Sequence, residues 1–426
     1  MKQLFSVVMM FSVLNVVPMD ITQSHYHKPV GTDLVRQEGT GCSVIEKIKV
    51  IIRNFIIHIL LFGIGLFALL FSLVSCNNAN PKTDVSVELK DTFHFSTIYE
   101  IPATQIKQQI SGTCWAYSTA SFLESEIYRI KGYFIELSPM YFVYNAYIRK
   151  SENFILRQGT ARFSEGGCNY DPLIDVDSVG IMPSGIYHGD TVPSHQKLMD
   201  EMLPLVNAFA NRKIEGNWRG KIKHVLDAYL GCPPTKFIYK GTGFTPKQFW
   251  EFTELNKEHY VNLTSFIHES LNEYVILQIP ANWTSMRYFN VSLDEYMENI
   301  DNALSKGFSL AVAMDLTGPE LSEIQGFARM PSDSVVSPET RQRDFENFIT
   351  TDDHNMHIIG KVRDKDGNLY YKCKNSWGVN FGLDGCYYLS PSYLRAKSIY
   401  VMVNQKGLLD TTYKKMEKCR CCMKEY

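Results

Sequence analysis

The residue of greatest chemical interest is Cys114, in the stretch Ser111-Gly112-Thr113-Cys114-Trp115. A cysteine acts as a nucleophile only as its thiolate, and a helix N-terminus, a nearby cation or hydrogen bonds to sulfur lower the pKa of a thiol. Apolar residues recur at close to a 3.6-residue period from Cys114 to Gly132, so the sequence predicts a helix that begins at Cys114. Gly112 permits a tight turn ahead of it. Taken alone, a cysteine in this position is more often structural than reactive.

A histidine partner would change that interpretation, and His354 is the best candidate among the 11 histidines. It stands at the start of a strand-like run, and Asn375 stands at the end of the next one. Asp366-Gly367-Asn368 between the runs is typical of a hairpin turn. Such a hairpin would place His354 and Asn375 side by side, so that the amide orients the imidazole for the thiol of Cys114. His357 is the rival base, but three positions along a strand it points to the opposite face.

The order Cys, His, Asn, followed by Ser376-Trp377-Gly378, resembles the papain-like cysteine peptidases. Their local signature around the nucleophile is matched as well. The resemblance makes Gln108, six residues before the nucleophile, an oxyanion-hole donor. It makes Trp377 a shield over the hydrogen bond between histidine and asparagine. It also implies that Gly166 and Gly167 run beside the substrate backbone.

The length of the chain between the nucleophile and the base indicates a branch of this family. About 240 residues separate Cys114 from His354, against roughly 130–150 in the small papain-type enzymes. The extra residues match helical patterns at about 190–300. The bleomycin hydrolase and aminopeptidase C branch is similar in carrying such a helical insertion. Ser111 also favours this branch, because it stands where small secreted members have a disulfide cysteine.

The resemblance covers roughly Ile101–Leu409 and implies an α+β, two-lobed papain-like fold. The helical lobe would carry the cysteine, and an antiparallel β lobe would carry the histidine and the asparagine. The order of the predicted elements, with helices first and strands last, separately indicates an α+β fold. The implied function is hydrolysis of peptide substrates through an acyl-enzyme, with no cofactor and no metal.

The C-terminal residues bear on substrate specificity. In this branch the C-terminus lies in the active-site cleft, where its carboxylate receives the substrate's amino group, so the enzymes are aminopeptidases. Here a basic tail, 410–426, follows Leu409 and contains Cys419, Cys421 and Cys422; we expect it to be solvated rather than to bind a metal. The resemblance implies aminopeptidase action, and endopeptidase action is the alternative if the tail does not occupy the cleft. The ring-shaped hexamer of the branch implies a possible homo-oligomer.

Two other classes of function compete with a peptidase. One is a catalytically silent, peptide-binding lipoprotein on the same scaffold. The other is a structural or metal-binding surface protein built around the cysteine-containing tail. A nucleic-acid partner is excluded, because the net charge is −2 and the lysines and arginines form no basic stripe outside the tail.

Residues 1–75 are interpreted as a targeting region, with a signal or transmembrane segment at about 48–75. A basic flank precedes the apolar run Phe55–Val74, which is long enough to span a bilayer. The following Leu73-Val74-Ser75-Cys76 resembles the lipobox of bacterial lipoproteins, which makes Cys76 a lipidation site. The alternative is a plain transmembrane anchor in which Cys76 is incidental. Both predict a membrane-anchored protein outside the cytoplasm, with 76–100 as a tether and N-terminal arm. A separate hypothesis is that 1–47 are an upstream extension absent from the product, because a better-formed signal follows them.

Overall fold

The computed structural model describes residues 94–109, 111–189, 194–323, 325–330 and 336–424. All of them belong to one compact unit, Asp84–Tyr426. The targeting region, Cys76 and most of the tether therefore lie outside the described residues. In the part of the chain that is described, no helix has both the length and the apolar character needed to cross a membrane.

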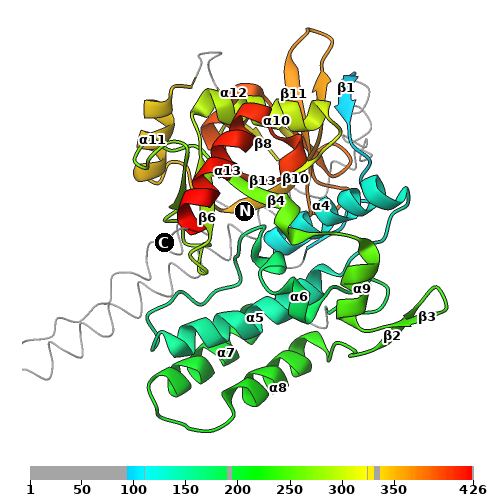
Figure 1. Ribbon diagram of the computed structural model, residues 1–426, viewed down its shortest axis with the longest axis vertical. Coiled ribbons are helices and arrows are strands. Elements are labelled where there is room, and N and C mark those ends of the chain that lie inside the picture. Colours follow the sequence, from blue (N-terminus) through cyan, green and yellow to red (C-terminus); the bar gives the residue numbers. More distant parts are fainter. Residues whose placement is uncertain (1–93, 110, 190–193, 324, 331–335, 425–426) are drawn as a thin grey trace, which may run out of the picture. The chain divides into compact units, whose positions relative to one another are not determined.

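A group of helices packs around one hydrophobic core in the first half of the unit (Figure 1). Its elements are α4 (Cys114–Lys131), α5 (Pro139–Leu156), η1 (Asp171–Leu173), α6 (Val176–Val179), α7 (Gln196–Ala210), α8 (Trp218–Leu230) and α9 (Pro246–Thr253), with the hairpin β2 (Phe237–Tyr239) and β3 (Thr242–Phe244). The boundaries follow from local chemistry. Gly132 ends α4 in the left-handed conformation, and the Ser138 side chain accepts a hydrogen bond from Tyr141 N at the start of α5.

Among the described residues, eleven strands form a second part, a single large sheet. Its strand order is β5-β6-β4-β13-β7-β10-β11-β12-β9-β8, and β1 pairs with β10. The strands are β1 (Ser96–Glu100), β4 (Tyr260–Thr264), β5 (Glu273–Ile276), β6 (Arg287–Asn290), β7 (Leu310–Met314), β8 (Leu321–Ser322), β9 (Phe327–Ala328), β10 (His354–Arg363), β11 (Leu369–Lys374), β12 (Cys386–Leu389) and β13 (Ser398–Asn404). The remaining helices are η2 (Lys257–His259), α10 (Leu293–Ser305), α11 (Pro338–Glu346), α12 (Pro391–Lys397), η3 (Gln405–Gly407) and α13 (Asp410–Lys424).

Helix α4 joins the two parts, because it packs against α5 on one side and against β7 and β10 on the other. Figure 1 shows α4 between the other helices and the sheet. The N-terminus of α4 therefore lies where residues of both parts can meet.

The segment expected as a helical insertion, about 190–300, is interrupted by strands between its third helix and α10. Helices α7, α8 and α9 occupy 196–253, but 260–290 contributes β4, β5 and β6 to the sheet. All five residues of β4, YVNLT, are buried, and β4 pairs antiparallel with β13. The tyrosine, valine and threonine of β4 favour a strand, and pairing with β13, far along the chain, selects strand over helix for this segment.

The expectation of a solvated C-terminal tail is wrong for 410–424, which form α13. Thr412 and Met416 are fully buried on one face of this helix, and Cys419 packs against the same core. This apolar stripe at helical spacing outweighs the basic charge of the segment. Helix α13 contacts β5, which lies at the end of the sheet and is separated from β10 by β6, β4, β13 and β7.

Candidate active site

Cys114 is the first residue of α4 and is only 7% exposed. The backbone N–H groups in the first turn of a helix lack intrahelical acceptors, and the helix dipole favours a negative charge there. Burial raises the pKa of the Cys114 thiol, while hydrogen bonds from Asn355 and from the backbone of Trp115 lower it. The N-terminus of α4 and these hydrogen-bond donors therefore stabilise the thiolate and partly offset the rise in pKa that burial causes.

His354 opens β10, and its Nε2 lies 2.7 Å from Oδ1 of Asn375, the residue that follows β11. The backbone N–H of Ser376 also donates to Asn375 Oδ1, at 2.8 Å. A backbone N–H can only donate, so this atom is the oxygen and His354 Nε2 carries the hydrogen. The Nδ1 atom of neutral His354 is then the one able to accept a proton.

The indole of Trp377 covers this pair, with its ring centroid 4.6 Å from that of His354. His354 is 4% exposed. Burial lowers the pKa of His354 to about 4, and the hydrogen bond to Asn375 raises it in part. Burial thus favours the neutral forms of both Cys114 and His354, so the charged thiolate and imidazolium are stabilised only as a pair.

Gln108 lies beside Trp377 because the two residues form an antiparallel bridge. Gln109 N donates to Ser376 O at 2.7 Å, and Gly378 N donates to Lys107 O at 3.2 Å. The Gln108 side chain is exposed. A Cβ at Gly378 would lie 3.3 Å from Gln108 Oε1, so glycine there leaves room for that side chain.

Asn355 was not singled out from the sequence, but its side chain reaches the nucleophile. Its Nδ2 donates to Cys114 Sγ at 3.7 Å, and Asn355 is 5% exposed. Because Asn355 follows His354 directly, this contact places the start of β10 over the sulfur. No described residue pairs with Asn355 Oδ1, although that atom is buried.

His357, the rival base, is occupied elsewhere. Its Nδ1 is 2.9 Å from the hydroxyl of Ser121, two turns along α4 from Cys114, and the ring is fully buried. Burial, with a smaller contribution from Lys374, lowers the pKa of His357 well below its usual value. The structure therefore gives His357 a packing role between α4 and β10.

The glycine pair lies beside the nucleophile. Trp115 Nε1 donates to Glu165 O at 3.0 Å, which holds the loop before Gly166 against α4. A Cβ at Gly167 would lie 2.7 Å from Asp171 Oδ2 and 3.0 Å from the Trp115 ring, so this position has space only for glycine. At Gly166 no atom lies within 4 Å of the corresponding point, and that side of the loop is open.

A buried lysine fixes this loop. The Nζ of Lys150 donates to Ser164 O at 3.0 Å and to Gly166 O. Burial lowers the pKa of Lys150 to about 8 and raises that of the nearby Asp171 to about 6. Asp171 accepts hydrogen bonds from Cys168 N and Trp283 Nε1. The loop that borders Cys114 is thus held by the buried side chains of Lys150 and Asp171, which no sequence pattern links to it.

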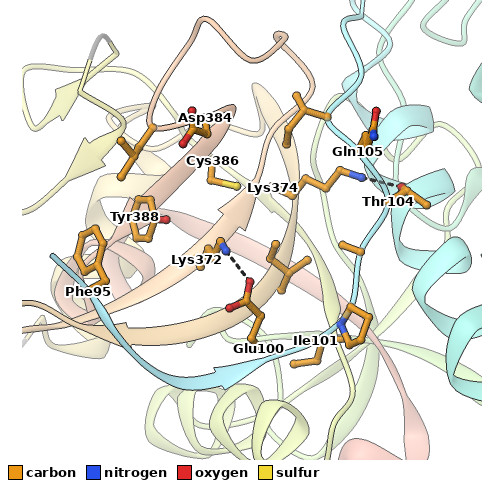
Figure 2. Close-up of a pocket in the computed structure, with 15 residues that line it drawn as sticks. Phe95, Glu100, Ile101, Thr104, Gln105, Lys372, Lys374, Asp384, Cys386 and Tyr388 are labelled. Carbon is orange, nitrogen blue, oxygen red and sulfur yellow. Dashed lines mark hydrogen bonds and ion pairs between the residues drawn. The ribbon is translucent and has the colours of Figure 1, made fainter. Parts of the chain in front are cut away.

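Figure 2 shows a separate cavity of about 710 Å³ between the segment 95–106 and strands β10, β11 and β12. Lys372 Nζ pairs there with Glu100 Oε1 at 2.6 Å, and Lys374 Nζ donates to Thr104 Oγ1 at 2.8 Å. None of the residues discussed above as catalytic candidates lines it. Within the described part of the chain, no cluster of His, Cys, Asp and Glu could hold a metal ion.

No protein-family model matches the chain, and no curated protein matches it. Its structure is similar to that of PepW from Lactobacillus rhamnosis HN001, with a TM-score of 0.64, 16% sequence identity, and coverage of 78% of this chain and 87% of that one. The chain has a papain-like, two-lobed α+β fold. The lobes of this fold meet at α4, with Cys114 on the helical side and His354 and Asn375 on the β side.

Two further solved structures match at lower similarity. The bromelain protease from Ananas comosus in complex with the E64 inhibitor has 14% identity and a TM-score of 0.33, over 70% of this chain and 92% of that one. The ragweed pollen cysteine protease Amb a 11, in its proform, has 13% identity and a TM-score of 0.35, over 74% of this chain and 66% of that one. Both TM-scores are below 0.5, so neither of these two similarities supports a structural argument.

Proposed function

We propose that this chain is a thiol-dependent peptidase that cleaves peptide bonds through an acyl-enzyme on Cys114. The observation that carries the proposal is the 2.7 Å contact between His354 Nε2 and Asn375 Oδ1, beside a cysteine at the first position of a helix. A base with one nitrogen fixed by an orienting group, next to a thiol, is the arrangement that nucleophilic catalysis requires. The papain-like fold supports the same proposal.

In the first half-reaction the Cys114 proton passes to His354 Nδ1, and the sulfur attacks the scissile carbonyl carbon. The Gln108 side-chain amide and the Cys114 backbone N–H stabilise the oxyanion; one such donor typically contributes about 3–4 kcal/mol. His354 then gives its proton to the leaving amine as the C–N bond breaks, which leaves a thioester on Cys114.

In the second half-reaction a water molecule attacks the thioester carbonyl. His354 Nδ1 removes a proton from this water and returns it to the sulfur as the C–S bond breaks. A carboxylic acid is released and the thiol is regenerated. Asn375 keeps the imidazole oriented through both steps, and Trp377 excludes water from their hydrogen bond.

The test is hydrolysis of a peptide substrate together with labelling by an epoxide peptide inhibitor. The wild-type chain is expected to turn over the substrate and to bind one inhibitor molecule covalently at Cys114, while Cys114→Ser does neither. Turnover that survives in Cys114→Ser would overturn the mechanism. A wild-type chain that binds peptide without turnover or labelling would instead be the catalytically silent binding protein.

For specificity we propose aminopeptidase action, with endopeptidase action as the second candidate. The second candidate is favoured by one observation: α13 packs against β5, several strands away from β10, so residues 410–424 do not fill the cleft. Cleavage of a free-amine peptide but not of its N-acetylated form would support the first. Equal cleavage of both forms would support the second.

We further propose that the protein is attached to a membrane through a lipid on Cys76, with a transmembrane anchor as the alternative. The lipobox-like Leu73-Val74-Ser75-Cys76 supports the lipid. Cys76→Ala should abolish incorporation of labelled fatty acid and release the protein from the membrane fraction. Retention of the variant in membranes would favour the transmembrane anchor. The hexamer stays a prediction, to be tested by light scattering on the purified chain.

A further inference from the structure

Glu165 contacts the residues on both sides of the nucleophile. Its backbone oxygen accepts from Trp115 Nε1 at 3.0 Å, and its carboxylate Oε2 accepts from Gly112 N at 2.8 Å. The Ser111 hydroxyl donates to the same oxygen. Because Cys114 lies between Gly112 and Trp115, these contacts place the carboxylate at the border of the candidate cleft.

Among the residues that the structure describes, the donors to this carboxylate are neutral. They are a backbone N–H and a hydroxyl, and both act on Oε2, which leaves Oε1 for a ligand. The nearby cation Lys150 donates instead to backbone oxygens of Ser164, Glu165 and Gly166. Among the described residues, no cationic side chain forms a salt bridge with the Glu165 carboxylate, and the charges of Lys150 and His195 act on it without direct contact. A half-buried carboxylate without a salt-bridge partner favours a ligand that brings a cationic donor.

The carboxylate is held in place and has open space beside it. Lys150 holds the loop by donating to Ser164 O, and Gly167 packs against the Trp115 ring. On the open side, nothing lies within 4 Å of a Cβ built at Gly166. At Gly112 such an atom would lie 3.2 Å from Glu165 Oε2, so the side chain covers this glycine closely. The carboxylate is bonded to Gly112 N, two residues before Cys114, so its charge lies near the nucleophile.

We propose that Glu165 selects substrates with a positive charge on the residue that acylates Cys114. This inference rests on the proposed peptidase function and names its substrate class. The ammonium group has two possible sources, the free α-amine of an N-terminal residue or the side chain of lysine or arginine. The contact is a charge-assisted hydrogen bond from that ammonium group to Glu165 Oε1.

The experiment compares the full-length wild-type chain with Glu165→Gln on four fluorogenic amides. They are leucyl, acetyl-leucyl, lysyl and acetyl-lysyl amides of one coumarin. Glutamine keeps an oxygen that accepts from Gly112 N and Ser111 but removes the charge, so a purely structural role predicts no change in selectivity. Glu298→Gln, at an exposed position on α10, is the matched control and should behave as wild type.

In the wild type we expect kcat/KM to be about tenfold higher for the charged than for the uncharged substrates. In Glu165→Gln we expect this preference to disappear, while the variant still hydrolyses the acetyl-leucyl amide. A preference for leucyl over acetyl-leucyl amide identifies the α-amine as the source, and one for acetyl-lysyl over acetyl-leucyl amide identifies the side chain. An unchanged preference in Glu165→Gln, or none in the wild type, overturns the inference but not the peptidase.

A second measurement separates the two proposals. Binding of free and acetylated leucyl and lysyl dipeptides is measured by calorimetry on the Cys114→Ser chain and on its double variant with Glu165→Gln. Charge-dependent binding that Glu165→Gln abolishes supports the inference even if the wild type hydrolyses nothing, in which case only the peptidase proposal fails. Binding of all four dipeptides with equal affinity overturns the inference.

Discussion

The side-chain amide of Asn355 donates a hydrogen bond to the sulfur of Cys114, with 3.7 Å between Nδ2 and Sγ. This donor lowers the pKa of the thiol, against the larger opposite effect of burial. With its free Oδ1, the same amide can also accept from the neutral S–H after a rotation of its end group. Asn355 can therefore form a hydrogen bond with Cys114 in both states, as a donor to the thiolate and as an acceptor from the thiol.

Asn355→Ala is expected to raise the pKa of the Cys114 thiol, because the thiolate loses a donor. A hydrogen bond to a charged group contributes about 1.5–3 kcal/mol, so the midpoint of alkylation by iodoacetamide should move upward by about one to two pH units. The measurement is the rate of alkylation against pH, with Cys114→Ser as the blank. An unchanged midpoint would show that Asn355 only fills space.

The acid limb of kcat/KM depends on His354, whose pKa burial lowers to about 4. Below that pH the imidazole is already protonated and cannot accept the thiol proton, so activity should be lost as pH falls through about 4. The hydrogen bond to Asn375 raises this pKa, so Asn375→Ala should move the acid limb to lower pH. A shift to higher pH in that variant would contradict the assignment of Asn375 Oδ1 as acceptor.

The size of the effect at these two positions should also differ. His354→Ala removes the proton carrier itself and should abolish turnover, whereas Asn375→Ala removes an orienting partner and should lower kcat by about 10- to 100-fold. Single-turnover kinetics on one unblocked peptide would measure both. The reverse order would mean that Asn375 does more than orient the imidazole.

The sequence predicts those parts of the molecule that depend on local signals. The end of α4 follows from Gly132, and the start of α5 follows from Ser138 and Pro139. The contact of His354 with Asn375 follows from a hairpin that joins two residues 21 positions apart. The contact of Asn355 with Cys114 spans 241 residues and depends on how α4 packs against β10. No local pattern contains that information.

Helix α13 illustrates a different limit. Its basic residues and clustered cysteines suggest a solvated tail, yet Thr412 and Met416 are fully buried and the partly buried Cys419 continues the same stripe at helical spacing. Three weakly apolar positions give a poor signal until the surface that covers them is known. Here that surface includes α10, where Asn299 donates to Thr412 Oγ1 at 2.9 Å.

Met416→Ala should destabilise the fold without changing substrate choice. Truncation of a fully buried methionine costs about 2–4 kcal/mol, because it leaves a cavity. The melting temperature should fall, while the ratio of kcat/KM for free and acetylated substrates stays constant. A changed ratio would mean that α13 influences the cleft despite its position at the β5 end of the sheet.

Lys150→Met tests how the loop beside the nucleophile is held. The variant removes the buried ammonium group that donates to the part-buried carbonyl oxygens of Ser164 and Gly166, and the loss of each such hydrogen bond costs about 0.5–1.5 kcal/mol or more. We expect a lower melting temperature and a raised KM with a smaller change in kcat, because the loop that carries Glu165 and Gly166 loses its anchor. Lys150→Arg, which keeps a donor, is the control for loss of packing. If Lys150→Met lowers stability but leaves KM unchanged, the lysine supports the fold without positioning the loop.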